Sequence, residues 1–447
     1  MKGINVLLLI GLMSIWHVSV AQEKEGAAVQ VKQVEDVALE TTGSSRDGSY
    51  QVAWDLYKAG KYDEALKRIN KLIDQDQTIS AYYEVKCYIL IGLKRNADII
   101  ATATTGIALD PENYTFYDIR GNTYYFDLKP ELARSDYQRV LQLEKNNARY
   151  YNNYLKLLNE MRKDDELINV FKLFENNLKN GEEMAEPQFV ADVYFYGALA
   201  FQRQKNNLRA IELLDKAIEN SPKAAMYYNN RGLIFQDMDK LLQAKKDLDR
   251  AIELDINNPV YYENRYSVLF DLKKYQDAQN DLLKVISLGN SDLDIYAGLA
   301  LTYDVLNNYA KAAEYYDLVL QKSPKQRMIL GNYAYALFEL NQIPKSIEMF
   351  ERAHALDPSE IDVLVGLVVL YHLDGKDAKS EEVITAIKMK TTYSATKNLL
   401  DILEKGDYRF TSKFKSVWGN CFKYESIYRR MVLSYKSVEI NLIELMS

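Results

Sequence analysis

The stretch YYNNRGLIFQDMDKLLQAKKDLDRAIELD, residues 227–255, decides the fold of this chain. Its apolar residues follow the spacing of two amphipathic helices, so the stretch predicts one helical hairpin. The same pattern returns every 34 residues from Arg46 to about Lys388. A period of this length indicates stacked repeats, whose function lies on a repeated surface and not in a catalytic pocket.

Ten frames keep one register, apart from nine extra residues between the fourth frame and the fifth. Position 11 is large and apolar in every frame, position 4 is tyrosine in seven, and positions 8 and 20 are each small in six. We therefore expect positions 4 and 11 to pack between helices, and the small residues to let helix axes approach closely. The frames begin at Arg46, Ser80, Tyr114, Ala148, Ala191, Ala225, Pro259, Leu293, Arg327 and Ile361.

Two further columns complete the pattern. Position 24 is apolar in nine frames, and half of the eight prolines fall at position 32, where proline ends one helix and starts the next unit. These columns resemble the tetratricopeptide repeat, most specifically in residues 227–255 and in AGKYDEAL. The resemblance covers about three quarters of the chain, and frames two, four and ten depart from it at position 20. The resemblance implies an all-α fold, an α/α superhelical solenoid of about ten helical hairpins. The N-terminal residues described below add the expectation of a protein of the exported bacterial type.

Position 7 and position 23 vary together. The three frames with arginine at position 7 are the three with aspartate at position 23. Because these positions lie across the hairpin from one another, we predict a salt bridge between its two helices; a ligand-binding role and chance are the alternatives. The pairs are Arg120 with Asp136, Arg231 with Asp247 and Arg265 with Asp281.

The segments outside the repeat have their own composition. Lys2, an apolar run and small residues at Ser19 and Ala21 are typical of a secretory signal peptide, and no cysteine follows closely to attach a lipid. The predicted organisation is a signal peptide (1–21), a mobile leader (22–45), repeats one to four (46–177), an insertion loop (178–190), repeats five to ten (191–390), a capping helix (391–406) and a C-terminal tail (407–447).

Two of these segments allow several interpretations. The insertion, which contains Gly181 and Pro187, reads as a simple loop, a hinge or a partner-contact loop. The tail carries apolar residues from Ile427 to Leu445 at alternating spacings of three and four, which predicts an amphipathic helix. Additional capping, self-docking or dimerisation, and contact with a partner or a membrane all fit that helix.

Composition argues against several function classes. The chain has 56 basic and 63 acidic residues, a net charge of −7, so nucleic acid is a poor partner. Only His354 and His372 remain after a signal peptide is removed, and no glycine-rich phosphate loop is present. We therefore predict no enzyme, no metal site and no cofactor.

The resemblance also indicates where a partner binds. In that family the first helices line a concave groove, and positions 2, 5, 9, 12 and 13 point into it. Here those positions carry eleven acids and three bases in frames two to ten, together with aromatic and amide side chains. The candidate contacts are Asp118, Asn122, Tyr125, Phe126, Phe195, Asn229, Asp237, Glu263, Phe270, Asp271, Asp294, Asp304, Tyr335 and Phe338.

The sequence thus predicts a non-enzymatic scaffold that binds a protein or peptide with a basic or polar segment in an acidic, aromatic-containing groove. The alternative is that the first-helix face is merely solvated. The signal peptide predicts a periplasmic or extracellular location. An envelope or membrane-associated assembly factor, with the tail as the membrane contact, is the alternative function, and a carbohydrate-binding or enzymatic solenoid is a more distant one. Oligomeric state is left open.

Overall fold

The computed structural model describes residues 50–179 and 187–390. Within these two ranges the chain forms twenty α-helices and no strand, which confirms the predicted all-α class. The signal peptide, the leader, the capping helix and the tail lie outside the described residues.

The helices alternate between the first and the second helix of a hairpin. The first helices are α4 (Gln51–Lys58), α6 (Ser80–Gly92), α8 (Tyr114–Phe126), α10 (Ala148–Glu160), α12 (Pro187–Arg203), α14 (Ala225–Asp237), α16 (Pro259–Asp271), α18 (Leu293–Val305), α20 (Arg327–Glu339) and α22 (Ile361–Leu373). The second helices are α5 (Tyr62–Gln75), α7 (Asn96–Leu109), α9 (Pro130–Leu143), α11 (Asp164–Lys179), α13 (Asn207–Asn220), α15 (Leu241–Leu254), α17 (Tyr275–Ser287), α19 (Tyr309–Lys322), α21 (Ile343–Leu356) and α23 (Asp377–Lys390).

Eight of the first helices begin at the first residue of a predicted frame; α12 begins earlier. It starts at Pro187, so residues 187–190, which the sequence assigned to the insertion loop, are helical. Proline is well suited to the first position of a helix, because its missing N–H is not needed there. Phe189 and Val190 are buried, and this burial extends the helix upstream of its frame.

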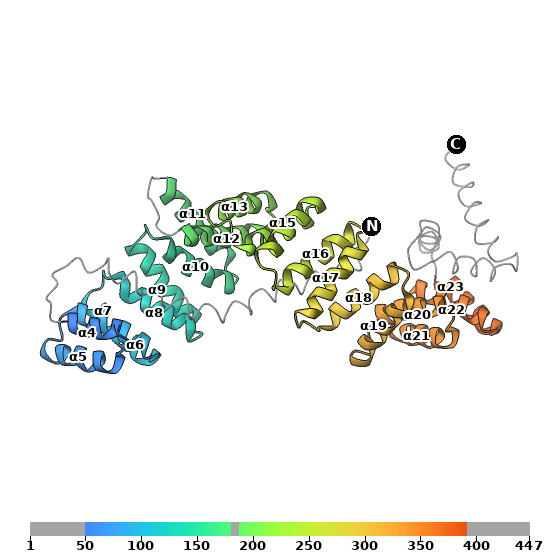
Figure 1. The fold of residues 1–447 in the computed structure, drawn as a ribbon, viewed down its shortest axis with the longest axis horizontal. Coiled ribbons are helices and arrows are strands. Elements are labelled where there is room, and N and C mark those ends of the chain that lie inside the picture. Colours follow the sequence, from blue (N-terminus) through green and yellow to red (C-terminus); the bar gives the residue numbers. More distant parts are fainter. Residues whose placement is uncertain (1–49, 180–186, 391–447) are drawn as a thin grey trace. The chain divides into compact units, whose positions relative to one another are not determined.

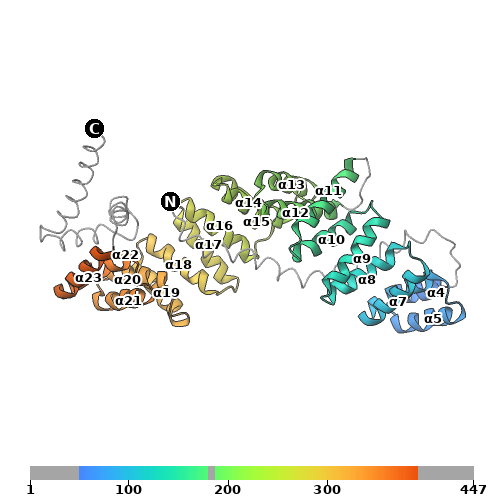
Figure 2. The same cartoon turned by 180° about the vertical axis from the view of Figure 1, so that it is seen from behind.

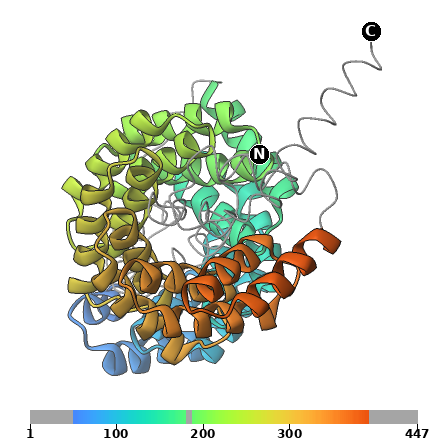
Figure 3. The same ribbon diagram turned by 90° about the vertical axis from the view of Figure 1, so that its right-hand side faces the viewer.

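The helices belong to two compact units. Unit 1 contains α4 to α15 and ends at Ile256, and unit 2 contains α16 to α23 and begins at Asn257 (Figures 1 and 2). The division falls between the sixth hairpin and the seventh, whereas the sequence suggested a division at the insertion. In each unit the two helices of a hairpin pack side by side, and the next hairpin packs against them (Figure 3).

The repeated columns form the core of both units. The alanines at position 20 have no exposed surface, and the position-24 side chains of the first nine hairpins are all buried. Small residues at position 8 lie opposite them: a Cβ atom on Gly232 would come within 3.2 Å of the carbonyl oxygen of Ala244 at position 20. The helix axes therefore approach closely where both side chains are short.

The position-4 tyrosines have a polar role besides packing. The hydroxyl groups of Tyr83, Tyr117 and Tyr228 each donate a hydrogen bond, of 3.2 to 3.3 Å, to the carbonyl oxygen six residues earlier. That carbonyl belongs to position 32 of the preceding hairpin. Phenylalanine would leave it without this partner, which explains why the column prefers tyrosine.

Each first helix ends in the same backbone turn. Position 15 has a φ angle between 55° and 74° in all ten hairpins, although only Gly60 and Gly375 are glycines there. The N–H of the next residue donates a hydrogen bond to the carbonyl oxygen five residues earlier. For example, Lys129 N–H donates to the Tyr124 carbonyl at 2.9 Å, which is the Schellman arrangement. Eight non-glycine residues therefore hold a left-handed conformation that L-residues adopt at a cost.

We expect Leu128→Gly to raise the free energy of unfolding by about 0.5 to 1 kcal/mol. Leu128 has a φ of 55° and is 87% exposed, so glycine relieves the strain and removes little buried surface. Urea unfolding followed by circular dichroism measures the change. Gln138→Gly, at an exposed position inside α9, is the control and should lower stability by about 1 kcal/mol. A loss of stability in both variants would contradict the strain argument.

The predicted arginine–aspartate pairs are confirmed. Arg120, Arg231 and Arg265 each bond their aspartate through two nitrogens, at 2.7 to 2.9 Å. Each guanidinium also lies 5.7 to 5.8 Å from the ring centroid of the position-4 tyrosine three residues earlier. The pair therefore connects the two helices of one hairpin and fixes the arginine against an aromatic face.

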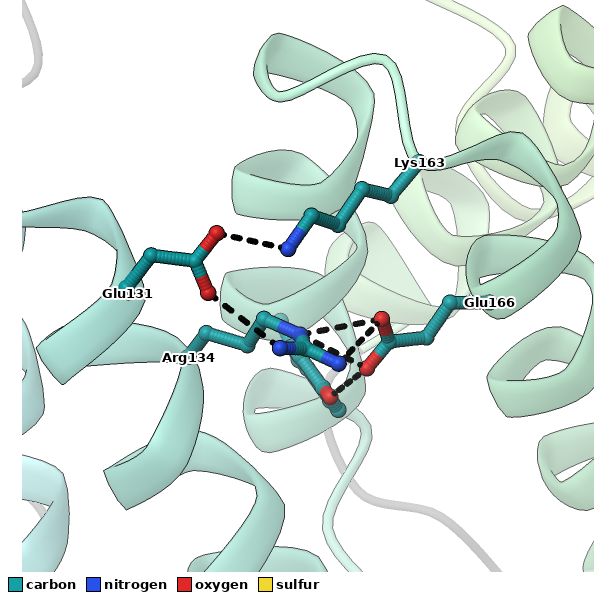
Figure 4. A network of polar contacts seen from close by, with 5 residues as sticks. Glu131, Arg134, Lys163 and Glu166 are labelled. Atoms are coloured by element: carbon teal, nitrogen blue, oxygen red, sulfur yellow. Dashed lines mark hydrogen bonds and ion pairs between the residues drawn. The ribbon is translucent and has the colours of Figure 1, made fainter.

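Other ion pairs connect neighbouring hairpins. Between the third and fourth hairpins, Glu131 accepts a hydrogen bond from Lys163 at 2.7 Å, and Arg134 contacts both Glu131 and Glu166 (Figure 4). The hydroxyl of Tyr154 donates to Glu166 at 2.5 Å. This network fixes the third hairpin against the fourth through partly buried charged groups; only Glu131 is exposed.

Candidate protein-binding surface

A group of polar side chains links three consecutive first helices of unit 1. We call it the Arg149 cluster and define it as Glu84 and Tyr88 on α6, Asp118 on α8, and Arg149 and Tyr150 on α10. Nη2 of Arg149 lies 3.1 Å from Oδ2 of Asp118 and donates to the hydroxyl of Tyr150, also at 3.1 Å. Both charged side chains are mostly buried, and the predicted contact Asp118 is thus paired with a residue of the neighbouring hairpin.

The second carboxylate of the Arg149 cluster has a neutral partner. Oε2 of Glu84 accepts a hydrogen bond from Nδ2 of Asn113 at 3.2 Å, and the side chain is buried. Burial raises the pKa of Glu84, and it also raises the pKa of Asp118 against the opposing effect of Arg149. Two carboxyl groups are therefore held where the charged form is costly.

Asn122 continues this network along α8. Its amide nitrogen donates to Asp118 at 3.0 Å, and its oxygen accepts from the hydroxyl of Tyr137 at 2.7 Å. The amide of Asn153 also approaches that oxygen, at 3.4 Å. The side chain predicted to contact a partner backbone is thus engaged within the unit.

Two aromatic residues at the end of α8 lie nearer the surface. Tyr125 donates a hydrogen bond to Glu160 at 2.6 Å, and the ammonium group of Lys156 lies 5.2 Å from its ring centroid. Phe126 is 49% exposed and packs edge-on against Tyr125, with ring centroids 5.4 Å apart. These two rings are placed where a partner can reach them.

The fifth and sixth hairpins contribute another carboxylate. Asp192 accepts a hydrogen bond from the hydroxyl of Tyr227 at 2.5 Å, and burial raises its pKa. Phe195 packs against the ring of Tyr227 with centroids 5.4 Å apart. Asn229 is buried on α14, and Asp237 is exposed at the end of that helix.

In unit 2 the same positions carry acids without basic neighbours in those columns. Positions 2, 5, 9, 12 and 13 of α16, α18 and α20 hold five acids and no lysine or arginine. On α16, Glu263 accepts a hydrogen bond from Asn290 at 2.8 Å, and Asp271 is half-buried. Phe270 lies beside them, with its ring centroid 5.1 Å from that of Tyr275.

Asp304 on α18 is the most perturbed of these acids. It is buried and faces the hydroxyl of Tyr316, whose oxygen lies 3.4 Å from Oδ2. Burial, together with the charge of Glu339 on α20, raises the pKa of Asp304 to about 7. Asp294 is exposed at the start of α18, and partial burial and the charge of Asp292 raise its pKa as well.

Three predicted aromatic contacts lie in the core. Phe195, Tyr335 and Phe338 are only 4%, 5% and 1% exposed. Tyr335 packs edge-on against the buried ring of Phe350, with centroids 4.9 Å apart. Their columns point toward the groove in the family pattern, but here large neighbours enclose the rings, so they stabilise the hairpins and offer little surface to a partner.

Sequence reasoning overlooked several partners in this surface. Arg149 is one of the three bases on the predicted face, but the repeat positions indicate neither its pairing with Asp118 nor the contacts of Asn113 and Tyr150. These contacts do not recur at the same repeat positions in other hairpins, so no column of the repeat reveals them. The available signal was the presence of a base, Arg149, at position 2, where other frames carry acids or neutral residues.

Neither a metal nor a membrane site emerges from the parts of the chain that the structure describes. Residues 50–179 and 187–390 contain no group of three or more histidine, cysteine, aspartate or glutamate side chains able to hold a metal ion. In the same ranges, the helices are too short or too polar to cross a bilayer.

Comparison with known proteins gives partial matches. A curated Plasmodium berghei protein, the 58 kDa phosphoprotein, is 32% identical over 92 residues, which are 21% of this chain and 22% of that protein. Human RNA polymerase II-associated protein 3 is 28% identical over 149 residues, 33% of this chain and 20% of that protein. The chain thus spans about a fifth of the length of each relative.

Among solved structures, YrrB, described as a TPR protein with an unusual peptide-binding site, is 20% identical. The match covers 41% of this chain and 95% of that chain, with a TM-score of 0.38.

Two segments match the tetratricopeptide repeat family directly. Residues 225–258 match one family description and residues 267–327 match another. The first segment corresponds to the hairpin α14–α15, and the second runs from within α16 to the first residue of α20. With the same hairpin repeated on both sides of these segments, the chain is a tetratricopeptide repeat protein.

Proposed function

We propose that this protein is a non-enzymatic scaffold that binds a basic segment of a partner protein along its first helices, and that it acts outside the cytoplasm. Tetratricopeptide repeats are suited to protein–protein interaction. The location rests on the signal-peptide pattern of residues 1–21.

One observation carries the choice of a basic partner. In unit 2, Glu263, Asp271, Asp294, Asp304 and Glu339 occupy the face of three consecutive first helices, and no lysine or arginine shares these positions. Like charges on neighbouring helices repel one another, and burial increases the cost. A positively charged segment lying across these helices would offset that repulsion and would be steered toward the face.

A defined peptide tests this proposal. We expect a fluorescein-labelled peptide of alternating lysine and glycine to bind the full chain in an anisotropy titration, and a glutamate–glycine peptide not to bind. The triple variant Glu263→Gln, Asp271→Asn and Asp294→Asn should weaken binding of the lysine peptide by about tenfold, because each lost ion pair contributes up to about 1 kcal/mol. The loss should shrink at high salt.

A matched control separates the face from net charge. Asp277→Asn, Glu314→Gln and Glu348→Gln remove three exposed acids from second helices of the same unit. The charge change equals that of the first triple variant. Because these three acids lie away from the first-helix face, the affinity for the lysine peptide should change less than about twofold. Equal weakening by both triple variants would show that net charge, and not the first-helix face, attracts the peptide.

A further inference from the structure

We propose that the C-terminal tail of this chain docks on the first-helix face of unit 2, with the apolar stripe of residues 427–445 against Val365 and Val369 of α22. This docking does not depend on the proposed function. Its consequence, competition between the tail and the partner segment for the same face, rests on the proposed function.

Helix α22 is enclosed on all sides. Every residue from Val363 to Tyr371 is buried, and this run makes more than two helical turns, so it covers every direction around the axis. Val365 and Val369, at positions 5 and 9 of the tenth hairpin, are both 0% exposed. These positions belong to the first-helix face, so that side of α22 is covered as well as the sides that meet other helices.

The burial of the first-helix face increases toward the end of unit 2. At position 9, Ser267 of the seventh hairpin is half-buried, and the exposed fraction then falls from 7% to 5% to 0% in the next three hairpins. The last described hairpin has a neighbouring hairpin on one side only, where α22 packs against α21 and α20 (Figure 1). If neighbouring hairpins alone covered this face, burial should decrease at that end and not increase.

An eleventh hairpin does not provide the missing cover. Position 21 of the second helix is buried or half-buried in each of the first nine hairpins, as at Ile347 on α21. In α23 the same position is Glu381, and it is exposed. The stack of hairpins therefore ends at α23, and the cover over α22 comes from a segment that does not extend the stack.

The chain itself contains a segment of the required kind. Residues 391–447 follow α23, and they include apolar side chains that recur every three or four residues, as one side of a helix requires. A helix over residues 427–445 is about 28 Å long, enough to cross α20 and α22 at the usual spacing of about 10 Å. The apolar residues are Ile427, Met431, Tyr435, Val438, Leu442 and Leu445.

Charge favours the same occupant. Residues 423–436 contain four bases and one acid, Glu425. The first-helix face beside α22 carries Glu339 on α20 and Asp294 and Asp304 on α18, with no lysine or arginine in these columns. Ion pairs beside an apolar contact would fix the orientation of the docked helix. The bases are Lys423, Arg429, Arg430 and Lys436.

The tether favours the tail of the same chain over the tail of a second copy. A segment joined to α23 by a short linker is present at α22 at an effective concentration of about 1 mM, far above that of another protein molecule in a dilute solution. The tail also shares the basic character of the proposed partner segment. It is therefore expected to occupy the face until a partner displaces it.

Photocrosslinking tests the docking. Benzoyl-phenylalanine replaces Met431 in the full chain, and the crosslinked peptides are identified by mass spectrometry after illumination. We expect crosslinks to α20 or α22 of the same chain. Benzoyl-phenylalanine in place of Leu433, on the opposite side of the predicted helix, is the control and should give few of them. Crosslinks that join two chains, or a lack of crosslinks to α20 and α22, would overturn the docking.

Peptide affinity tests the competition. The full chain with Met431→Asp and Val438→Asp should bind the lysine–glycine peptide about tenfold more tightly than wild type, because acids in the stripe release the tail and open the face. Leu433→Asp with Ile440→Asp adds the same charge, at the same spacing, on the opposite side of the predicted helix. This control should stay within about twofold of wild type.

The outcomes separate the two proposals. Equal affinity of the Met431 and Val438 double variant and wild type would overturn the competition. An equal gain in both double variants would overturn it too, because added charge would then explain the gain. If neither wild type nor any variant binds the peptide, the proposed function fails, whereas the crosslinks still decide whether the tail docks on α22.

Discussion

Replacing Asp136 by alanine is expected to lower the free energy of unfolding by about 3 kcal/mol. The aspartate side chain is 5% exposed, and it binds two nitrogens of Arg120 across the third hairpin. Once it is removed, Arg120 keeps a neutral hydrogen bond to the hydroxyl of Thr104 at 3.0 Å and its contact with the ring of Tyr117, but no ion pair among the described residues. A mostly buried guanidinium without a counter-ion is the source of the loss, which urea unfolding measures.

Asp247→Ala is the matched comparison and should cost less, about 1 to 2 kcal/mol. Its partner, Arg231, also contacts Asp215 of the preceding hairpin at 2.6 Å, so a carboxylate remains after the substitution. The test is which of the two variants loses more free energy of unfolding. A larger loss for Asp247→Ala would show that the pair stabilises the fold through packing and not through charge compensation.

Asp304→Asn should raise stability at about pH 8 by up to roughly 4 kcal/mol and leave it unchanged near pH 4. The pKa of Asp304 is raised from 3.8 to about 7 in the folded chain, chiefly by burial. Its contribution to stability is therefore fully present below 3.8 and is lost as the pH rises through 7. Asparagine keeps an oxygen for Tyr316 but carries no charge, so it avoids that loss.

Urea unfolding at several pH values, followed by circular dichroism, measures the difference between Asp304→Asn and wild type. The exposed acid Asp277 on α17 gives the control, since Asp277→Asn should follow the wild-type curve. A constant stability difference from pH 4 to pH 8 would contradict titration of a buried carboxyl and would point to a packing effect. Because the charge of Glu339 contributes to the raised pKa of Asp304, Glu339→Gln should lower that pKa. The pH range over which Asp304→Asn changes stability should then become narrower.

The hairpin itself could be predicted from the sequence because its contacts recur. In the third hairpin, Arg120 binds Asp136, and the buried Ala133 lies where the two helices approach closely. Later hairpins repeat these residue types at the same positions. Such contacts join residues of one hairpin at a constant spacing, so they appear as columns in a single sequence. The period, the starts of eight first helices, the tyrosine and alanine positions and the three ion pairs all belong to this class.

The candidate surface was predicted less well. The acidic character of the first helices follows from the frame positions, but the exposure of each side chain does not. Phe338 shares a groove column with the half-buried Phe270, yet it is enclosed in the core of unit 2. A repeat position specifies the direction in which a side chain leaves the helix axis. Whether that side chain is buried depends on the size of the side chains on the neighbouring hairpins.

The sequence by itself determined that the chain is a stack of helical hairpins with an acidic first-helix face, since both follow from the repeated 34-residue spacing and the residue types at its positions. Only the tertiary structure decided that Arg149 binds Asp118 across two hairpins, that Glu84 has a neutral partner, and that Asp304 is buried. The physical reason is that these contacts occur once, between side chains distant in sequence. Their burial depends on neighbours that no periodicity records.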